Sequence, residues 1–191
     1  KKNLKLIQYA SEIEAHTLCI ITGGISDQKI SVEKARNEIT DYLLNLTEIA
    51  KTYGTNLGLE IIHPIELPFK GCINSIKSAL TIIQIIPELN IIIDFFHSWW
   101  DPDLLEFLEK NINKISLIQF CNAIELDNDI KPSRETPLDG LIDTKMLLNK
   151  ATQHGYNEFF EFEIFNKDLR GRSVDKIIRK ASEQFFKIQK Y

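Results

Sequence analysis

Asp94 and His97, three residues apart, are the pair in this chain whose types and spacing suggest chemistry. They lie in the stretch I-I-I-D-F-F-H-S-W-W-D-P, directly after the apolar run at residues 91–93. Such a short apolar run is typical of a buried strand in a parallel sheet. A carboxylate beside a buried strand is costly unless a partner neutralises it, and a divalent metal ion is one such partner. Alternatively, Asp94 caps the next turn and His97 packs under two tryptophans, and this stretch alone leaves both interpretations open.

Polar side chains also occur at or near the ends of three other apolar strands, at Glu60, Gln119 and Glu163. In a barrel of parallel strands, the carboxyl ends of the strands meet at one face, which is where such barrels place their active sites. Each residue taken singly could be an ordinary polar contact at a strand end. Because four polar positions follow four otherwise apolar strands, we predict that they share one site.

An alternation of helices and strands positions these residues. Strands are predicted at residues 16–22, 56–62, 91–94, 115–121 and 158–165, and helices at 3–13, 32–51, 74–86, 102–110, 142–154 and 173–189. This order indicates βαβ units and a parallel sheet. The absence of G-x-G-x-x-G after the first strand argues against a dinucleotide-binding fold, and the polar strand ends favour an arc of a (β/α)₈ barrel. Residues 123–140 are predicted to be a long polar loop, a kind of connection that is often functional.

Composition limits the class of protein. The 191 residues are 43% hydrophobic, which is enough for one domain with one core over residues 1–191. The net charge of −4 provides no basic field for nucleic acid or an anionic membrane. Cys19, Cys72 and Cys121 have no C-x-x-C spacing, so we expect reduced thiols in a cytoplasmic protein. No run is long enough to span a membrane, and because the first residue is not Met, we expect the chain to begin partway through a longer protein.

Several stretches resemble the xylose isomerase-like TIM barrel family of sugar phosphate isomerases and epimerases. They are L-E-I-I-H-P at residues 59–64, D-F-F-H-S-W-W-D-P at 94–102, G-Y-N-E-F-F-E-F-E-I-F at 155–165, and Arg134 followed by L-D-G-L-I-D at 138–143. The second stretch is the most specific. The resemblance implies an α/β fold, the (β/α)₈ barrel of the xylose isomerase-like type. It covers roughly the C-terminal five βα units, so the first three strands are expected to be missing.

The resemblance also implies one divalent metal ion, held by Glu60, Asp94, residue 119 and Glu163. Residue 119 is Gln here, where the family has His, and Asn122 stands where the family usually has Asp. An amide oxygen suits harder ions than imidazole does, so Mn²⁺ or Mg²⁺ is favoured, with Co²⁺ or Zn²⁺ as alternatives. We therefore predict that Gln119→His raises affinity for Zn²⁺ relative to Mg²⁺.

The implied reaction is isomerisation or epimerisation of a small sugar or sugar-derived substrate, by proton transfer next to a carbonyl through an enediolate. Glu60 and Glu163 are the implied acid and base, and His97 the implied donor to the developing oxyanion.

Three residues are predicted to contact the substrate, and each has a simpler alternative. His63 lines the pocket, or it is a loop histidine bonded to backbone. Arg134 clamps a hydroxyl or phosphate, or it is a solvated loop charge. Trp99 stacks on a sugar, or it packs at the start of a helix.

Other functions remain open at this stage. They are a dehydratase of a cyclic polyol or keto acid on the same barrel, and a non-catalytic relative in which Gln119 and Asn122 mark a decayed metal site. An endonuclease IV type of nuclease is disfavoured by the four histidines and the negative charge. The predicted partner is a small sugar-like molecule, not nucleic acid or a membrane, and a homo-oligomer is left open.

Overall fold

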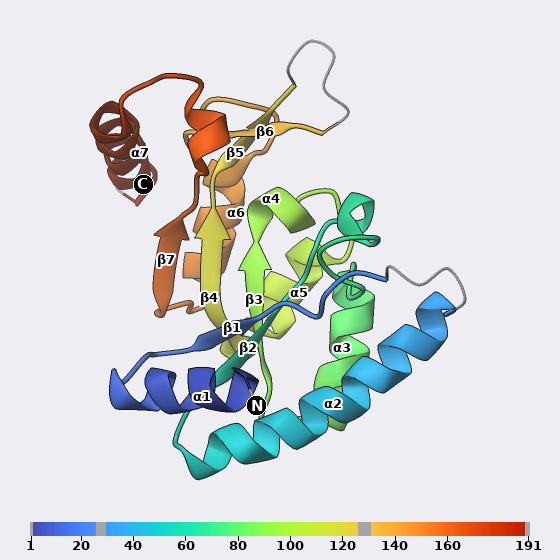
Figure 1. Ribbon diagram of the computed structural model, residues 1–191. Helices are drawn as coiled ribbons and strands as arrows, with labels where there is room; N and C mark the ends of the chain where they lie inside the picture. Colours follow the sequence, from blue (N-terminus) through green and yellow to red (C-terminus); the bar gives the residue numbers. More distant parts are fainter. Residues whose placement is uncertain (1, 26–29, 126–130, 190–191) are drawn as a thin grey trace. The chain divides into compact units, whose positions relative to one another are not determined.

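The computed structural model describes residues 2–25, 30–125 and 131–189, which belong to two compact units (Figure 1). The first unit comprises Lys1–Ile93 and Asn113–Leu117, and the second comprises Asp94–Ile112 and Ile118–Tyr191. Each unit is described by itself below. The single domain over residues 1–191 therefore stays a prediction.

Helices and strands alternate along most of the chain. The strands are β1 (Leu18–Ile20), β2 (Leu57–Glu60), β3 (Asn90–Asp94), β4 (Ile115–Phe120), β5 (Asn122–Ile124), β6 (Ser133–Glu135) and β7 (Phe159–Phe162). The α-helices are α1 (Lys2–Glu12), α2 (Val32–Thr52), α3 (Ile76–Ile85), α4 (Phe95–Ser98), α5 (Leu104–Lys110), α6 (Thr144–Gln153) and α7 (Val174–Gln189). Three short 3₁₀ turns are η1 (Pro64–Glu66), η2 (Ile112–Lys114) and η3 (Asn166–Leu169).

Among the described residues, the main sheet has five strands in the order β1-β2-β3-β4-β7. β2 pairs in parallel with both β1 and β3, and Glu60 lies opposite Ile92 in the register of the second pair. Strand neighbours that follow chain order, with helices between them, are what successive βα units of a barrel produce. The predicted α/β fold with five such strands is confirmed.

The predicted polar loop at residues 123–140 is partly wrong. β5 and β6 pair antiparallel in a second, two-stranded sheet, with Ala123 opposite Arg134, and Figure 1 shows this hairpin beyond the end of β4. Residues 126–130 of the predicted loop lie outside the described part of the chain. The hairpin escaped prediction because its strands are only three residues long and carry no apolar alternation.

Local signals in the first unit explain where its elements begin and end. Ser31 caps α2, its side chain accepting a hydrogen bond from the backbone N–H of Lys34. Gly54 follows α2 with φ of +68°, a conformation that glycine adopts without steric cost. β2 is buried along its whole length. Neighbouring apolar strands therefore form the core of this unit, and the one carboxylate in β2, that of Glu60, comes at its end.

In the second unit, aromatic side chains show which way β4 and β7 face. They form a cluster of ring contacts between 4.8 and 6.4 Å: Phe120, Tyr156, Phe160, Phe162 and Phe185. Because side chains alternate along a strand, Gln119 and Glu161 point away from this cluster and from α7. Gln119 of β4 and Glu161 of β7 thus share the face opposite the helix.

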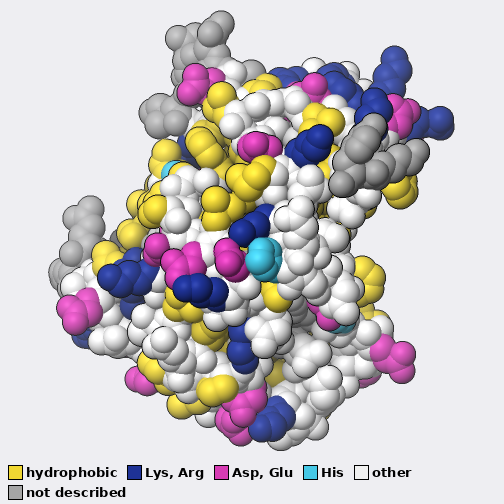
Figure 2. All heavy atoms as spheres, turned by 180° about the vertical axis from the view of Figure 1, so that it is seen from behind, with side chains coloured by type: hydrophobic (Ala, Val, Ile, Leu, Met, Phe, Trp, Pro, Cys, Tyr) yellow, Lys and Arg dark blue, Asp and Glu magenta, His cyan; other side chains and the backbone are white. Residues whose placement is uncertain are grey.

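The surface shows no field of a single sign on the face drawn in Figure 2, where acidic and basic side chains are interspersed. Among the described residues, no helix is both long and apolar enough to cross a bilayer.

Candidate metal and substrate site

Asp94 ends β3 and is fully buried. One carboxylate oxygen accepts a hydrogen bond of 2.9 Å from the backbone N–H of Phe96 and so caps α4. The other oxygen lies 2.6 Å from Nη2 of Arg134. The capping interpretation is therefore correct for one oxygen, while the second oxygen has the charged partner that a buried carboxylate requires.

Arg134 is 2% exposed and joins two carboxylates. Its Nη2 lies 2.6 Å from Asp94 and 2.8 Å from Glu163, and its Nη1 donates to the sulfur of Cys121 at 3.3 Å. Its guanidinium carbon lies 4.3 Å from the ring centre of Phe96, a cation–π contact. Burial by itself lowers the pKa of Arg134, but the neighbouring negative charges, Asp94 first among the carboxylates, raise it above its ordinary value. The alternative of a solvated loop charge is wrong.

A network of charged residues behind β6 holds the backbone on which Arg134 lies. The N–H of Arg134 donates to buried Asp168 at 3.3 Å. The next residue, Glu135, is 5% exposed and is bonded by Arg170 and by Arg172, whose Nη1 lies 2.9 Å from its Oε1. These contacts tie the hairpin to η3 and its flanking segment. They hold the backbone of Arg134 in place. Its guanidinium therefore needs little further ordering to contact the carboxylates of Asp94 and Glu163.

Glu135 should make the stability of this unit depend on pH. Burial raises the pKa of Glu135, but hydrogen bonds from Arg172 and from the N–H of Thr136 lower it more, so the pKa lies below 4.5. A depressed pKa in the folded state stabilises above the unfolded-state pKa, and this contribution is lost as pH falls through the folded-state pKa. Glu135→Gln should therefore lower the unfolding free energy by about 1 to 3 kcal/mol at pH 7, and by less in acid.

Urea unfolding of the wild type and of Glu135→Gln, at neutral pH and below pH 4.5, would measure this difference in unfolding free energy. Exposed Glu183 in α7 provides the matched control, since Glu183→Gln should change stability little at either pH. If the difference in unfolding free energy between the wild type and Glu135→Gln were the same at both pH values, the charge of Glu135 would not be what stabilises the hairpin.

His97 lies in α4 and is 4% exposed. Its Nε2 is 3.8 Å from Asp94, and its ring meets that of Phe96 edge-on. Nε1 of Trp100 donates to the backbone oxygen of His97 at 2.8 Å, whereas Trp99 is 39% exposed. The structure thus brings His97 to Asp94, and the role of Trp99 as a wall for a sugar stays a prediction.

Gln119 is 6% exposed, and its two amide atoms differ sharply in their surroundings. Nε2 donates to Oε1 of Glu161 at 2.9 Å. Oε1 is buried and accepts no hydrogen bond from any residue that the structure describes. A buried carbonyl oxygen without a partner costs free energy, so this atom is suited to a ligand that supplies positive charge.

Asn122 organises the segment between β6 and α6. Its Nδ2 donates to the backbone oxygens of Pro137 and Ile142, and its Oδ1 accepts from the N–H groups of Ala123 and Ile142. A Cβ at Gly140 would lie 2.4 Å from this Oδ1, so only glycine fits there. The amide of Asn122 is used fully in holding this segment, and an aspartate could not donate the two bonds to carbonyl oxygens.

Two predicted site residues belong to the first unit and have neighbours there. Glu60 is 4% exposed, with one oxygen 3.7 Å from Nζ of Lys70 and the other accepting from the Cys19 thiol at 3.3 Å. Nδ1 of His63 accepts from the N–H of Ile65 at 3.1 Å and caps η1, so the alternative of a backbone-bonded histidine is present. Lys70 beside Glu60 was not predicted, because a lysine in a short polar loop gives no signal in the sequence.

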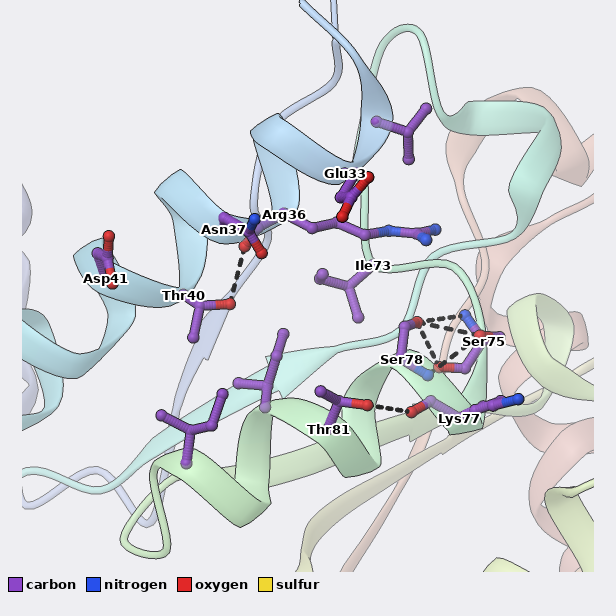
Figure 3. Close-up of a pocket in the computed structure, with 13 residues that line it drawn as sticks. Glu33, Arg36, Asn37, Thr40, Asp41, Ile73, Ser75, Lys77, Ser78 and Thr81 are labelled. Carbon is purple, nitrogen blue, oxygen red and sulfur yellow. Dashed lines mark hydrogen bonds between the residues drawn. The ribbon is translucent and has the colours of Figure 1, made fainter.

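A groove of about 710 Å³ lies between α2 and α3, away from the strand ends (Figure 3). Its polar groups mainly serve the helices themselves. Nε of Arg36 donates to the oxygen of Cys72, and Ser75 with Ser78 forms the capping box of α3. The carboxylates among its described lining residues, Glu33 and Asp41, both come from α2.

Comparison with known proteins identifies the relatives of this chain. The model of the family described as "xylose isomerase-like TIM barrel" matches residues 1–188. The inosose isomerase of Halalkalibacterium halodurans is 25% identical over 169 residues, which are 83% of this chain and 57% of that protein. For the inosose isomerase of Bacillus subtilis the identity is 24%, with 83% and 58% covered. The chain thus spans less than two thirds of the length of these relatives.

Solved structures show the same architecture. Protein SMc04130 from Sinorhizobium meliloti superposes with a TM-score of 0.89 at 25% identity, covering 98% of this chain and 70% of that chain. The zinc-bound IolI protein gives 0.78 at 18% identity, covering 98% and 67%. The 3-keto-D-glucoside 4-epimerase YcjR of E. coli gives 0.73 at 18% identity, covering 99% and 69%. In each case nearly all of this chain matches part of a longer one.

Proposed function

Because the chain belongs to the xylose isomerase-like TIM barrel family, we propose that it carries the catalytic face of a metal-dependent isomerase or epimerase. The substrate would be a small sugar or sugar-derived molecule, as the inosose isomerases among its relatives suggest. The observation that carries the proposal is the cluster of Asp94, Glu163 and Arg134, in which two carboxylates meet one buried guanidinium. Since the chain spans 57% to 58% of these relatives, the activity of a whole enzyme is part of the proposal.

The residues fit a divalent metal ion. In the second unit, buried Asp94 and His97 offer a carboxylate and an imidazole, with Nε2 of His97 3.8 Å from Asp94. In the first unit, buried Glu60 at the end of β2 offers a further carboxylate. The buried Oε1 of Gln119 lacks a hydrogen bond from the described residues and is a further oxygen donor.

We assign Glu60, Asp94, Gln119 and Glu163 as the metal ligands, an oxygen-rich set that favours Mn²⁺ or Mg²⁺ over Zn²⁺. When bound, the ion would polarise the carbonyl and a neighbouring hydroxyl of the substrate and so favour the enediolate. Arg134 would compete in part with the metal ion, because the Arg134 guanidinium already pairs with Asp94 and Glu163.

The proton transfer falls to Glu163 and Glu60. Glu163 is 23% exposed and lies 2.8 Å from Arg134, and its carboxylate is proposed as the general base. Glu60, with Lys70 3.7 Å away, would return a proton to the adjacent carbon or to the opposite face. His97 would donate to the oxygen on which negative charge develops.

Arg134 then has two tasks in this proposal. It contacts Glu163 at 2.8 Å and so orients that carboxylate, and through its planar fork it can also bind a substrate hydroxyl or phosphate. His63 and Trp99 are proposed to line the substrate pocket. The proposed partner is a small molecule, neither nucleic acid nor a membrane, and the proposed location is the cytoplasm.

Deuterium exchange tests this function directly. With Mn²⁺ and a panel of ketoses and inososes in D₂O, the protein should place deuterium on the carbon next to the carbonyl and form the isomeric product. This is expected because abstraction of the proton to a carboxylate lets it exchange with solvent. Mass spectrometry and NMR of the products would measure both.

Removal of the metal with EDTA should stop exchange and isomerisation together. Asp94→Asn should weaken Mn²⁺ binding in calorimetric titration. Loss of water from the substrate would instead identify a dehydratase. An absence of both metal binding and exchange would identify a non-catalytic relative and end the proposal.

A further inference from the structure

Glu161 is exposed in β7, two residues before Glu163, and has no role in the chemistry above. Its Oε1 lies 2.9 Å from Nε2 of Gln119. From this contact we propose that Glu161 is a positioning residue that sets the orientation of the Gln119 amide and thereby the metal preference of the site. The inference rests on the proposed function, because it takes Oε1 of Gln119 as a metal ligand.

The two ends of the Gln119 amide differ in hydrogen bonding, because the NH₂ group donates and the oxygen accepts. An ionised carboxylate only accepts hydrogen bonds, so it can bond the NH₂ group of Gln119 but not the oxygen. Turning the amide over would place two oxygens against each other and lose a bond to a charged acceptor. Glu161 therefore selects the orientation in which Nε2 points to β7 and Oε1 does not.

The other end of the amide supplies the second observation. Gln119 is 6% exposed, and its Oε1 is buried without a hydrogen-bond donor among the described residues. If the amide served only to pair β4 with β7, this oxygen would be left with an unmet requirement for a partner. Its burial and its fixed direction instead suit a ligand atom, held by an outer carboxylate as metal-bound side chains commonly are.

The same contact would also act on a histidine at this position. In Gln119→His, the carboxylate of Glu161 can accept from one ring N–H, which leaves the other nitrogen as an unprotonated ligand. Glu161 would then hold an amide oxygen for a hard ion in the natural chain and an imidazole nitrogen for Zn²⁺ in the variant. This gives the inference a test that does not depend on enzyme activity.

The test is calorimetric titration of Mn²⁺, Mg²⁺ and Zn²⁺ into the wild type and variants. Glu161→Ala should lower Mn²⁺ affinity about tenfold, the lower end of the effect of removing such an outer partner. Glu161→Gln should keep most of the affinity, because its carbonyl oxygen can still accept from Gln119. Exposed Glu158, just before β7, provides the control Glu158→Ala, which should change affinity less than about twofold.

A double-mutant cycle separates positioning from the simple loss of a negative charge. In a Gln119→Leu background, Glu161→Ala should have no further effect on Mn²⁺ affinity, because the amide through which it acts is gone. The Zn²⁺ to Mg²⁺ affinity ratio should rise about tenfold or more in Gln119→His and fall back in Gln119→His with Glu161→Ala.

Three outcomes would overturn the inference. An equal loss of affinity on Glu161→Ala in both backgrounds would show that Glu161 acts by charge alone. Unchanged affinities in Glu161→Ala and Gln119→Leu, with the wild type binding Mn²⁺, would exclude Gln119 as a ligand and leave the proposed function standing. Absence of metal binding by the wild type would remove the metal site of the proposed function and this inference with it.

Discussion

The Arg134→Met variant is expected to lose about 3 to 5 kcal/mol of unfolding free energy at neutral pH. The guanidinium is 2% exposed and lies within 2.8 Å of both Asp94 and Glu163, so its removal leaves a fully buried carboxylate without a charged partner. Met keeps much of the side-chain volume and its contact with aromatic rings, which separates loss of charge from loss of packing. Urea unfolding followed by circular dichroism would measure the loss.

A divalent metal ion should partly rescue this variant. Without Arg134, this guanidinium no longer competes for the carboxylates of Asp94 and Glu163, so Mn²⁺ should bind the folded state more tightly than in the wild type. Saturation at about 100 times the dissociation constant would restore about 2.7 kcal/mol. Exposed Arg179 in α7 gives the control Arg179→Met, which should change neither stability nor metal response appreciably. A loss below about 1 kcal/mol in Arg134→Met would show that the buried ion pairs contribute little.

Glu163→Gln should reduce turnover by about 10² to 10⁴-fold, the usual contribution of a general base. Gln keeps an oxygen that can ligate a metal ion and a group that can meet Arg134, but it cannot take a proton. The variant should therefore lose both product formation and deuterium exchange in the assay described above, while its affinity for Mn²⁺ falls much less.

The Glu60→Gln variant distinguishes the proposed role of Glu60 from that of Glu163. If Glu163 abstracts the proton, Glu60→Gln should still exchange deuterium into the substrate while forming little product, because only the return step is blocked. Glu183→Gln, in exposed α7, should leave both rates unchanged. Undiminished exchange in Glu163→Gln would show that another group is the base.

Residues 91–97 show what the local sequence predicts and what it does not. The run of three isoleucines predicted a buried strand, and all three are fully buried in β3. The Asp that follows was correctly expected to need a partner. The capping interpretation is right for one oxygen, the other oxygen is paired with Arg134, and the interpretation of Asp94 as a metal ligand stays a proposal. No spacing in the sequence indicated that the charged partner would be Arg134.

Arg134 and Gln119 show what tertiary structure decided. Arg134 was predicted as either a substrate clamp or a solvated charge, whereas β6 and the contacts of Glu135 place it against Asp94, 40 residues earlier in the chain. For Gln119, the residue type predicted a preference for hard ions. The contact with Glu161, 42 residues away, leaves Oε1 as the amide atom that accepts no hydrogen bond from the described residues.

The physical reason is the range of the forces involved. Periodicity, caps and turn residues act within a few positions, so strands, helices and the polar ends of strands can be read from the sequence by itself. Ion pairs and side-chain hydrogen bonds require atoms to meet within about 3 Å, and which atoms meet depends on strand order and on the β5–β6 hairpin. The sequence therefore determined which acidic, basic and amide side chains are available, and the fold decided which of them form ion pairs and hydrogen bonds with one another.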